Sequence, residues 1–147
     1  MYKTFDIDYS DITHIKTLWE KNRIYHEVNS EYFKELYRSI CFKHLTEGLK
    51  DIPEDELKIT VTQKDETYIG YCISVITNNS GELKSLHVDK DFRGRGIGRE
   101  LVGEHLQWLK KKNCKSIGVK VSYENDPTIS FYKRLGFFPN TLHMQLN

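Results

Sequence analysis

The sequence predicts a mixed α/β fold in which strands alternate with amphipathic helices. An apolar strand, Leu83–Val88, runs into a glycine-rich turn, and an amphipathic helix, Ile97–Lys112, follows at once. Upstream, two alternating segments, Leu57–Gln63 and Thr67–Ile76, flank a Lys-Asp-Glu turn, which is typical of a hairpin. The 147 residues show no break in composition, so we expect a single domain over residues 1–147.

The N-terminal part is predicted to form one strand, two helices and a loop. Tyr2–Ile7 alternates weakly and is the first strand. Ser10 is expected to cap a helix, and Ser30 a second one. The apolar stripe of the first helix comprises Ile12, Ile15, Leu18 and Trp19. The apolar face of the second comprises Tyr32, Phe33, Leu36, Tyr37, Ile40 and Cys41. The acidic stretch Gly48–Glu56 contains a proline and predicts a loop.

The C-terminal part is predicted to continue this alternation. Asn78-Asn79-Ser80-Gly81 is a strong turn signal before the strand that ends at Val88. Lysines at 110–112 favour the C-terminal end of the following helix through its dipole. The buried side of that helix comprises Ile97, Leu101, Val102, His105, Trp108 and Leu109.

A strand, a short helix and a last strand are predicted to follow. Ser116–Val121 alternates as a strand. Asp126 as N-cap and Pro127 at the first helical position predict a helix that ends at Gly136. Thr141–Leu146 is the last predicted strand.

The composition indicates a cytoplasmic protein. No apolar run approaches the length of a membrane span, and the N-terminus lacks the apolar region of a signal peptide. Cys41, Cys72 and Cys114 form no C-x-x-C pair, so we expect reduced, mostly buried thiols. The six histidines show no metal-ligand spacing, so no metal is expected.

The net charge of +1 hides an asymmetry along the sequence. Residues 1–82 hold 10 Lys and Arg against 15 Asp and Glu, whereas residues 83–147 hold 12 against 6. A basic half suits an anionic cofactor, and an acidic half suits a cationic amine. A chance difference between solvated faces explains the asymmetry equally well.

The glycine-rich turn Arg93-Gly94-Arg95-Gly96-Ile97-Gly98 is the strongest functional signal. Glycines let backbone N–H groups approach a ligand, and a helix N-terminus adds unpaired donors and partial positive charge. The arginines add forked cationic donors that suit phosphate oxygens. The turn lacks both the G-x-G-x-x-G dinucleotide spacing and the Walker pattern. Its R-x-x-G-x-G spacing resembles the pyrophosphate loop of the N-acetyltransferase (GNAT) family, which binds acetyl-coenzyme A.

A second motif supports the same resemblance. The segment from Asn125 to Phe137 resembles the family's N-x-x-A-x-x-[FL]-Y-x-x-x-G-F motif. Thr128 stands where the family usually has alanine, and Lys90 stands where many members have proline. The resemblance runs from about Lys58 to Phe137 in the right order. It implies a mixed, largely antiparallel central sheet flanked by helices, and often a homodimer.

The resemblance also implies an activity and its site residues. We expect an N-acetyltransferase that moves an acetyl group from acetyl-CoA to a primary amine by direct attack in a ternary complex. The expected coenzyme-binding residues are Leu86, His87, Val88, Arg93, Gly94, Arg95, Gly96, Ile97, Gly98, Arg99, Asn125 and Tyr132. Strand amides at 86–88 would polarise the thioester carbonyl. Asn125 would bind the cofactor arm or cap the short helix.

Two catalytic residues are implied, each with an alternative. Tyr132 is the expected acid for the leaving thiolate, and packing on the coenzyme is its alternative role. Glu82 lies where related enzymes often place a carboxylate base, and His87 titrates in a suitable range. A water chain could serve instead of either, and both side chains could be purely structural.

The resemblance implies an acceptor pocket built from the first two helices and the loop between them. The candidate residues there are Tyr25, His26, Glu27, Glu31 and Tyr32. Their carboxylates and phenols suit an ammonium group, although a charged helix face is usually just solvated. A non-catalytic acyl-CoA sensor is the alternative function. Nucleic-acid binding through Arg93, Arg95, Arg99 and the lysines at 110–112 fits poorly with a net charge near zero.

Overall fold

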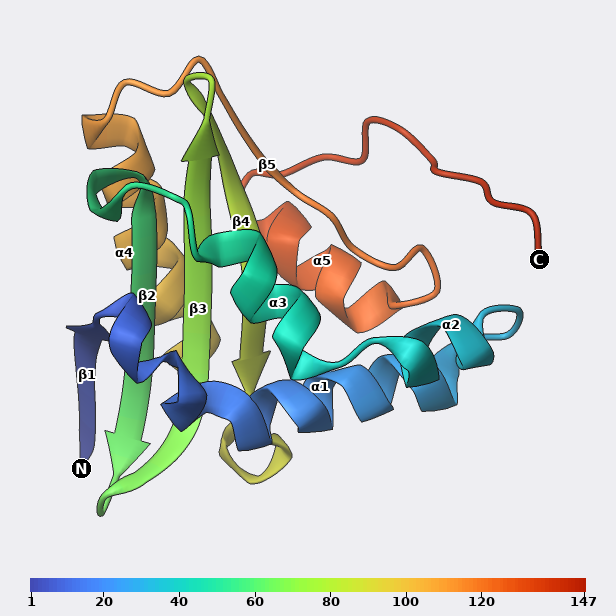
Figure 1. The fold of residues 1–147 in the computed structure, drawn as a ribbon, viewed down its shortest axis with the longest axis horizontal. Coiled ribbons are helices and arrows are strands. Elements are labelled where there is room, and N and C mark those ends of the chain that lie inside the picture. Colours follow the sequence, from blue (N-terminus) through green and yellow to red (C-terminus); the bar gives the residue numbers. More distant parts are fainter.

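The computed structural model describes residues 1–147 as a five-stranded sheet with helices on both faces (Figure 1). The strands are β1 Tyr2–Ile7, β2 Leu57–Lys64, β3 Thr67–Thr77, β4 Ser80–Val88 and β5 Ser116–Val119. They lie in the order β1-β2-β3-β4-β5, and only the β4–β5 pair is parallel. The mixed, largely antiparallel sheet is therefore confirmed.

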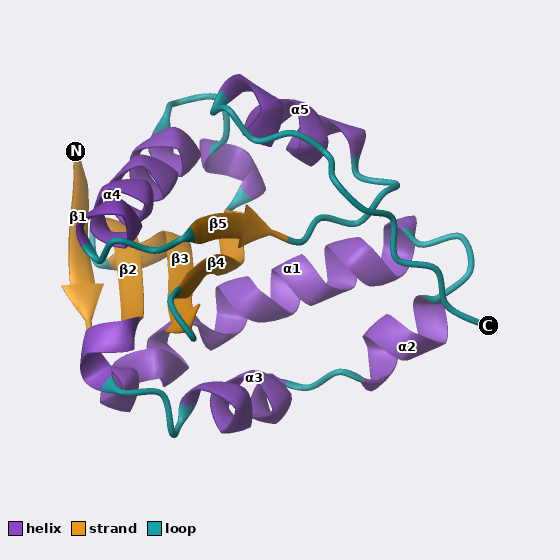
Figure 2. Ribbon diagram, turned by 90° about the horizontal axis from the view of Figure 1, so that it is seen from above, coloured by secondary structure: helices purple, strands orange, loops and turns teal.

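Five α-helices and three short 3₁₀ helices surround this sheet. The α-helices are α1 Lys16–Asn29, α2 Lys34–Ser39, α3 Phe42–Leu49, α4 Ile97–Lys111 and α5 Asp126–Arg134. The 3₁₀ helices are η1 Tyr9–Ile15, η2 Glu54–Glu56 and η3 Lys90–Phe92. Figure 2 shows α4 and α5 on one side of the sheet and α1 and α3 on the other. No helix is both long enough and apolar enough to cross a membrane.

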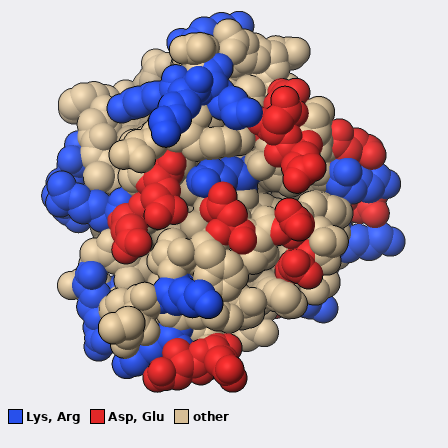
Figure 3. All heavy atoms as spheres, turned by 90° about the vertical axis from the view of Figure 1, so that its left-hand side faces the viewer, with Lys and Arg blue, Asp and Glu red and all other residues tan.

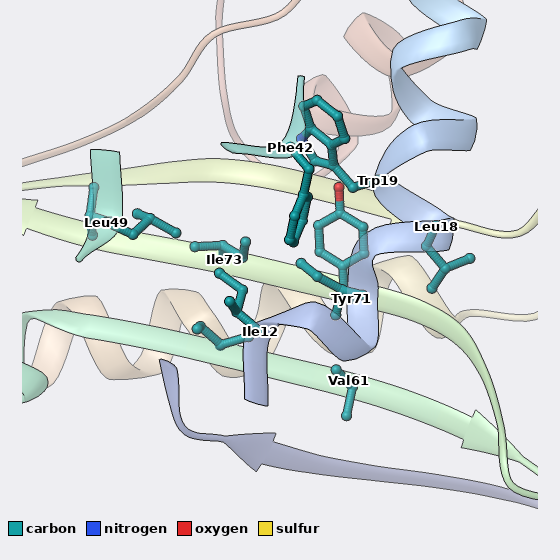
Figure 4. Close-up of a cluster of buried hydrophobic side chains, with 11 residues drawn as sticks. Ile12, Leu18, Trp19, Phe42, Leu49, Val61, Tyr71 and Ile73 are labelled. Atoms are coloured by element: carbon teal, nitrogen blue, oxygen red, sulfur yellow. The ribbon is translucent and has the colours of Figure 1, made fainter. Parts of the chain in front are cut away.

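Each face of the sheet has its own apolar core. On the α1 and α3 side, Trp19 and Phe42 meet edge to face at 5.6 Å above Tyr71 and Ile73 of β3 (Figure 4). On the opposite side, α4 and α5 cover a second cluster that includes Leu101 and Tyr132. Burial of these apolar side chains provides the main stabilisation of both layers.

The β3–β4 hairpin brings Gly81 against α4. Asn78 and Asn79 both have positive φ, as a two-residue turn of type I′ requires, so β4 begins at Ser80 rather than Leu83. Directly after this turn, the α carbon of Gly81 faces the buried side chain of Leu109.

We expect Gly81→Ala to lower the free energy of unfolding by about 1–3 kcal/mol, because it overpacks the core. An added Cβ would lie 2.7 Å from Leu109 Cδ2, and this leucine is fully buried in the core. Denaturant titration measures the effect. Gly118→Ala on β5 is the control, since its Cβ would meet nothing within 4 Å. Equal losses in the two variants would contradict this packing.

The N-terminal helices differ from the prediction. Ser10 lies inside η1 and caps nothing, and α1 starts only at Lys16, although the predicted stripe from Ile12 to Trp19 is buried. Ser30 ends α1, and its hydroxyl accepts a hydrogen bond from the Phe33 N–H in the next turn. The second predicted helix is split in two, because the chain is extended at Ile40 and Cys41.

The burial of this split segment also differs from the prediction. No residue of α2 is buried, and α3, which was partly predicted as a loop, supplies Phe42 and Leu49 to the core instead. Of the three free cysteines, Cys72 is buried but Cys41 is exposed.

The C-terminal elements need two corrections. The N-cap of α5 is Asn125 rather than Asp126, because the Asn125 side chain accepts a hydrogen bond from the Thr128 N–H. Gly136 ends the helix with φ of +97°, as predicted. Thr141–Leu146 forms no strand, since it pairs with no other strand of the sheet.

The charge asymmetry of the sequence does not divide the surface around β1 and α4. Figure 3 shows basic and acidic side chains close together on that side of the molecule. The halves of the sequence are therefore not halves of this surface.

Candidate active site

Strands β4 and β5 pair over only part of their length. The parallel register runs from Ser80 with Ser116 to Leu83 with Val119, and it stops there. Figure 1 shows the chain after β5 leaving β4 toward α5. Residues 84–88 of β4 consequently have a partner strand on the β3 side only.

The free edge of β4 exposes the backbone of Leu86 and Val88. Asp89, at the end of the strand, donates its N–H to the Ile69 carbonyl of β3. Because N–H groups alternate in direction along a strand, His87 also faces β3, whereas Leu86 and Val88 face the open side. Two of the three predicted carbonyl-polarising residues thus present amides there.

The glycine loop continues from this open edge. Gly94 and Gly96 have φ of +76° and +82°, a region that disfavours other residues. Gly96 is the N-cap of α4, and its carbonyl accepts the Glu100 N–H. The N–H groups of the first helical turn, from Ile97 to Arg99, therefore have no partner within the helix.

The start of α4 is held tightly in place. Ile97 is buried, and a Cβ on Gly98 would touch the Phe131 ring at 3.5 Å and Val88 at 3.7 Å. Nothing lies within 4 Å of a Cβ on Gly94 or Gly96. One side of the loop is thus anchored between α5 and β4, and the other side is open to a ligand.

The three arginines of the loop have different surroundings. Arg93 Nε donates to the Val88 carbonyl at 2.9 Å, and its guanidinium lies 6.0 Å from the centre of the Tyr25 ring. Arg95 donates to the Tyr2 hydroxyl and lies over Phe92. Arg99 is exposed on α4. Only Arg93 is turned back toward the open edge of β4.

Tyr132 lies on the α4 side of the sheet. Its ring packs edge to face against Phe131 and Phe137, and 5% of the residue is exposed. Its hydroxyl makes no hydrogen bond, and no fully buried side-chain oxygen lacks a partner, so the hydroxyl reaches solvent. Burial, helped by nearby Cys72, raises the pKa of Tyr132 and keeps the phenol protonated.

Glu82 and His87 lie on the other face of β4. They are paired with Val75 and Tyr71, whose side chains belong to the α1 and α3 core, and directly paired residues share a face. Glu82 is half-buried beside Gly118, next to the point where β5 stops pairing. Burial, followed by the charge of Arg93, lowers the pKa of His87 to about 4.

The predicted acceptor residues do not form one group. Tyr25 donates its hydroxyl to Asn125 Oδ1 at 3.3 Å, close to the glycine loop. His26 stacks on Tyr37, and burial lowers the pKa of its imidazole. Glu27 is paired through both oxygens, with Arg23 at 2.8 Å and Arg38 at 3.1 Å.

Glu31 and Tyr32 line a cavity, and they also interact with Tyr123 and Glu124, two residues that the sequence did not single out. The cavity, of about 390 Å³, lies between residues 31–36 and the last three residues of the chain. The Glu31 N–H donates to Glu124 Oε2 at 3.0 Å, and Glu31 raises the pKa of Tyr32, with smaller effects from Tyr123 and Glu124. The position of Tyr123 and Glu124 just before Asn125 was their one sequence signal.

Comparison with known proteins places this chain in one family. The model of the acetyltransferase (GNAT) family matches residues 19–137. A peptidyl-lysine N-acetyltransferase, YjaB of Salmonella typhimurium, is 31% identical over 113 residues, which are 76% of this chain and 68% of that protein. An uncharacterized N-acetyltransferase of Methanocaldococcus jannaschii is 45% identical over 56 residues, but this match spans only 38% of the chain and 25% of the relative.

Solved structures share the whole fold. A Pyrococcus furiosus protein assigned as an acetyl transferase superposes with a TM-score of 0.79 at 22% identity, over 100% of this chain and 99% of that one. The aminoglycoside acetyltransferase AAC(6')-Iy, in complex with the bisubstrate analog CoA-S-monomethyl-acetylneamine, gives 0.72 at 18% identity, over 100% and 97%. At these identities the likeness concerns the fold.

Proposed function

Because the chain belongs to the acetyltransferase (GNAT) family, we propose that residues 1–147 act as one N-acetyltransferase domain. It would move an acetyl group from acetyl-CoA to a primary amine of a small molecule or peptide, by direct attack in a ternary complex. The observation that carries this proposal is the open edge of β4, which leads directly into the glycine loop and the α4 N-terminus. Backbone amides that could bind the thioester, on β4, are thus followed in the chain by amides that could bind the diphosphate, at the start of α4.

The diphosphate would bind at the start of α4. The first-turn N–H groups and the helix dipole favour anionic oxygens, and Arg93 adds a cationic fork. Farther along the arm, the Leu86 or Val88 N–H would donate to the thioester oxygen. Such a donor stabilises the negative charge that develops on this oxygen during attack.

Tyr132 would donate a hydrogen bond to the departing thiolate. Its raised pKa makes Tyr132 a weaker proton donor than the motif implied, because a weaker acid gives up its proton less readily. A protonated phenol next to the sulfur still stabilises the developing negative charge. Transfer of the whole proton becomes favourable when the thiolate is itself desolvated, because desolvation raises the pKa of the thiol.

Glu82 would help remove the proton of the amine. It lies on the face of the sheet opposite to Tyr132, so a base and an acid approach the thioester from two sides. An exposed amine is almost fully protonated at neutral pH, so a base or a water chain to Glu82 is useful. With its pKa near 4, His87 is a weak base and a poorer candidate.

The acceptor would enter near Glu31 and Tyr32. These residues, with Tyr123 and Glu124, present carboxylates and phenols beside the start of α5. Such groups can hold an ammonium ion. The names of relatives include acceptors as different as peptidyl-lysine and an aminoglycoside, so the acceptor class stays broad.

An acceptor screen tests this function. Release of free thiol from acetyl-CoA would be followed with a panel of polyamines, amino acids, aminoglycosides and lysine peptides. We expect at least one amine to stimulate release. Calorimetry with coenzyme A separates the alternative, because a non-catalytic sensor would bind the coenzyme and acetylate none of the amines. Absence of coenzyme binding would refute both functions.

We expect Gly96→Ala to weaken coenzyme A binding about tenfold, because a side chain at positive φ costs about 1–2 kcal/mol in the loop. The loop can relieve this strain only by moving its amides away from the diphosphate. Calorimetry measures the affinity. Gly103→Ala within α4 is the control, since this glycine has ordinary φ and nothing within 4 Å of its Cβ. An unchanged affinity in Gly96→Ala would contradict the placement of the diphosphate.

A further inference from the structure

Tyr25 connects two parts of the proposed coenzyme site, the glycine loop and the start of α5. Its ring lies under the Arg93 guanidinium, and its hydroxyl donates to Asn125 Oδ1 at 3.3 Å. The ring is half-buried, yet it belongs to neither apolar core. These contacts lie on the coenzyme side of the site, whereas the sequence placed Tyr25 in the acceptor pocket.

Arg93 is oriented before any ligand binds. Its Nε–H donates to the Val88 carbonyl at 2.9 Å, and the aromatic face of Tyr25 supports the guanidinium. Neither terminal nitrogen of the guanidinium makes a hydrogen bond or an ion pair, so the end of the fork is available for two phosphate oxygens. A free arginine side chain has considerable rotamer entropy, part of which these contacts remove in advance.

Asn125 receives the second contact of Tyr25. Its Oδ1 also accepts the Thr128 N–H at 3.4 Å, so the same oxygen caps α5 and binds α1. The Tyr25 hydroxyl therefore fixes the start of α5 relative to the glycine loop. This start leads to Phe131, which packs against Gly98 of α4.

We infer that Tyr25 is a positioning residue for the coenzyme diphosphate, because it holds the Arg93 fork in its binding orientation. This inference rests on the proposed function. The aromatic ring carries the effect on Arg93, and the hydroxyl adds the link to α5. Tyr25 itself need not touch the coenzyme.

Two thioesters separate this role from a general structural one. Acetyl-CoA carries the diphosphate, whereas acetyl-pantetheine has the same reactive arm without it. In Tyr25→Leu we expect KM for acetyl-CoA to rise about threefold, because Arg93 would lose more rotamer freedom on binding; this factor corresponds to about 0.65 kcal/mol, in the range of a cation–π contact at an exposed arginine. KM for acetyl-pantetheine and kcat should stay unchanged. Tyr25→Phe, which keeps the ring, should retain most of the affinity for acetyl-CoA.

A double variant tests whether the effect passes through Arg93. In the Arg93→Ala background, adding Tyr25→Leu should cause no further loss of coenzyme A affinity in calorimetry. Ile24→Ala, an exposed neighbour on α1, is the control for helix changes. Circular dichroism checks that each variant is folded.

The outcomes distinguish this inference from the proposed function. Equal losses with both thioesters, additive losses in the double variant, or unchanged affinity in Tyr25→Leu would each overturn the role of Tyr25 while the transferase stands. A wild-type protein that binds no coenzyme A would overturn the proposed function, and the inference with it.

Discussion

Tyr132→Phe is expected to lower kcat about 100-fold and to leave the dissociation constant of coenzyme A nearly unchanged, as loss of a catalytic acid does. The phenol is buried among Phe131 and Phe137, so phenylalanine fills the same space. Its hydroxyl makes no hydrogen bond within the protein, and its removal leaves no partner unsatisfied. The change should therefore affect the reaction and not the fold.

The pH profile adds a second test of Tyr132. Its pKa is raised above the ordinary value, so the phenol stays protonated through the range in which a free tyrosine ionises. For the wild type we expect no loss of kcat from this group up to roughly pH 10, the ordinary tyrosine value. A decline between pH 8 and 10 that disappears in Tyr132→Phe would show that its pKa is not raised.

Tyr68→Phe is the matched control. Tyr68 is half-buried, and its hydroxyl contacts His14 on the far side of the sheet from Tyr132. Its loss should leave kcat and coenzyme affinity as in the wild type. If Tyr132→Phe keeps full turnover, then Tyr132 only packs near the coenzyme, and the leaving thiolate takes its proton from solvent.

Local sequence signals predicted the parts of the fold that depend on local physics. Positive φ at Asn78 and Asn79, and at Gly94 and Gly96, is a property of a few neighbouring residues, so the turn and the glycine loop were predictable. The boundary between α2 and α3 was not. The extended chain at Ile40 and Cys41 has no proline or glycine to mark it, and burial of Phe42 against Trp19 is a long-range contact.

The site was predictable as a set of motifs but not as an arrangement. The motifs identified the loop and Tyr132, whose chemistry follows from residue type. The pairing of β4 with β5 ends at Leu83, and a period-two pattern does not encode where two strands separate. Tyr25 meets Asn125 across 100 residues of sequence, so only the folded chain shows that it belongs with Arg93.

His105, in the core, is a second residue whose partners could not be predicted from the sequence. Its position on the buried stripe of α4 was predicted, but its partners come from two strands. Nε2 lies 2.8 Å from Thr60 Oγ1, and Nδ1 lies 2.6 Å from Ser74 Oγ. Thr60 donates its own proton to Asp6, so it accepts from Nε2–H, and Nδ1 accepts from Ser74. The network thus requires a neutral imidazole.

His105→Leu is expected to lower the free energy of unfolding by about 2–5 kcal/mol, because it leaves buried Thr60 and Ser74 without their partner. Denaturant titration at pH 7 measures this loss. Adding Ser74→Ala should recover part of it, since the unpaired hydroxyl of Ser74 is then gone, whereas Thr60 keeps its hydrogen bond to Asp6. His143→Leu on the exposed C-terminal segment is the control.

The free energy of unfolding should also depend on pH differently in the wild type and in His105→Leu. Burial, with the charge of Lys58, lowers the pKa of His105 from 6.5 in the unfolded chain to about 3. The unfolded state therefore binds the extra proton first, so stability is full above pH 6.5 and falls as the pH decreases toward 3. His87 and Asp6 add slopes of the same sign, and these remain in both proteins. The wild type should thus lose stability more steeply than His105→Leu in this window, and parallel curves would mean that folding does not change the pKa of His105.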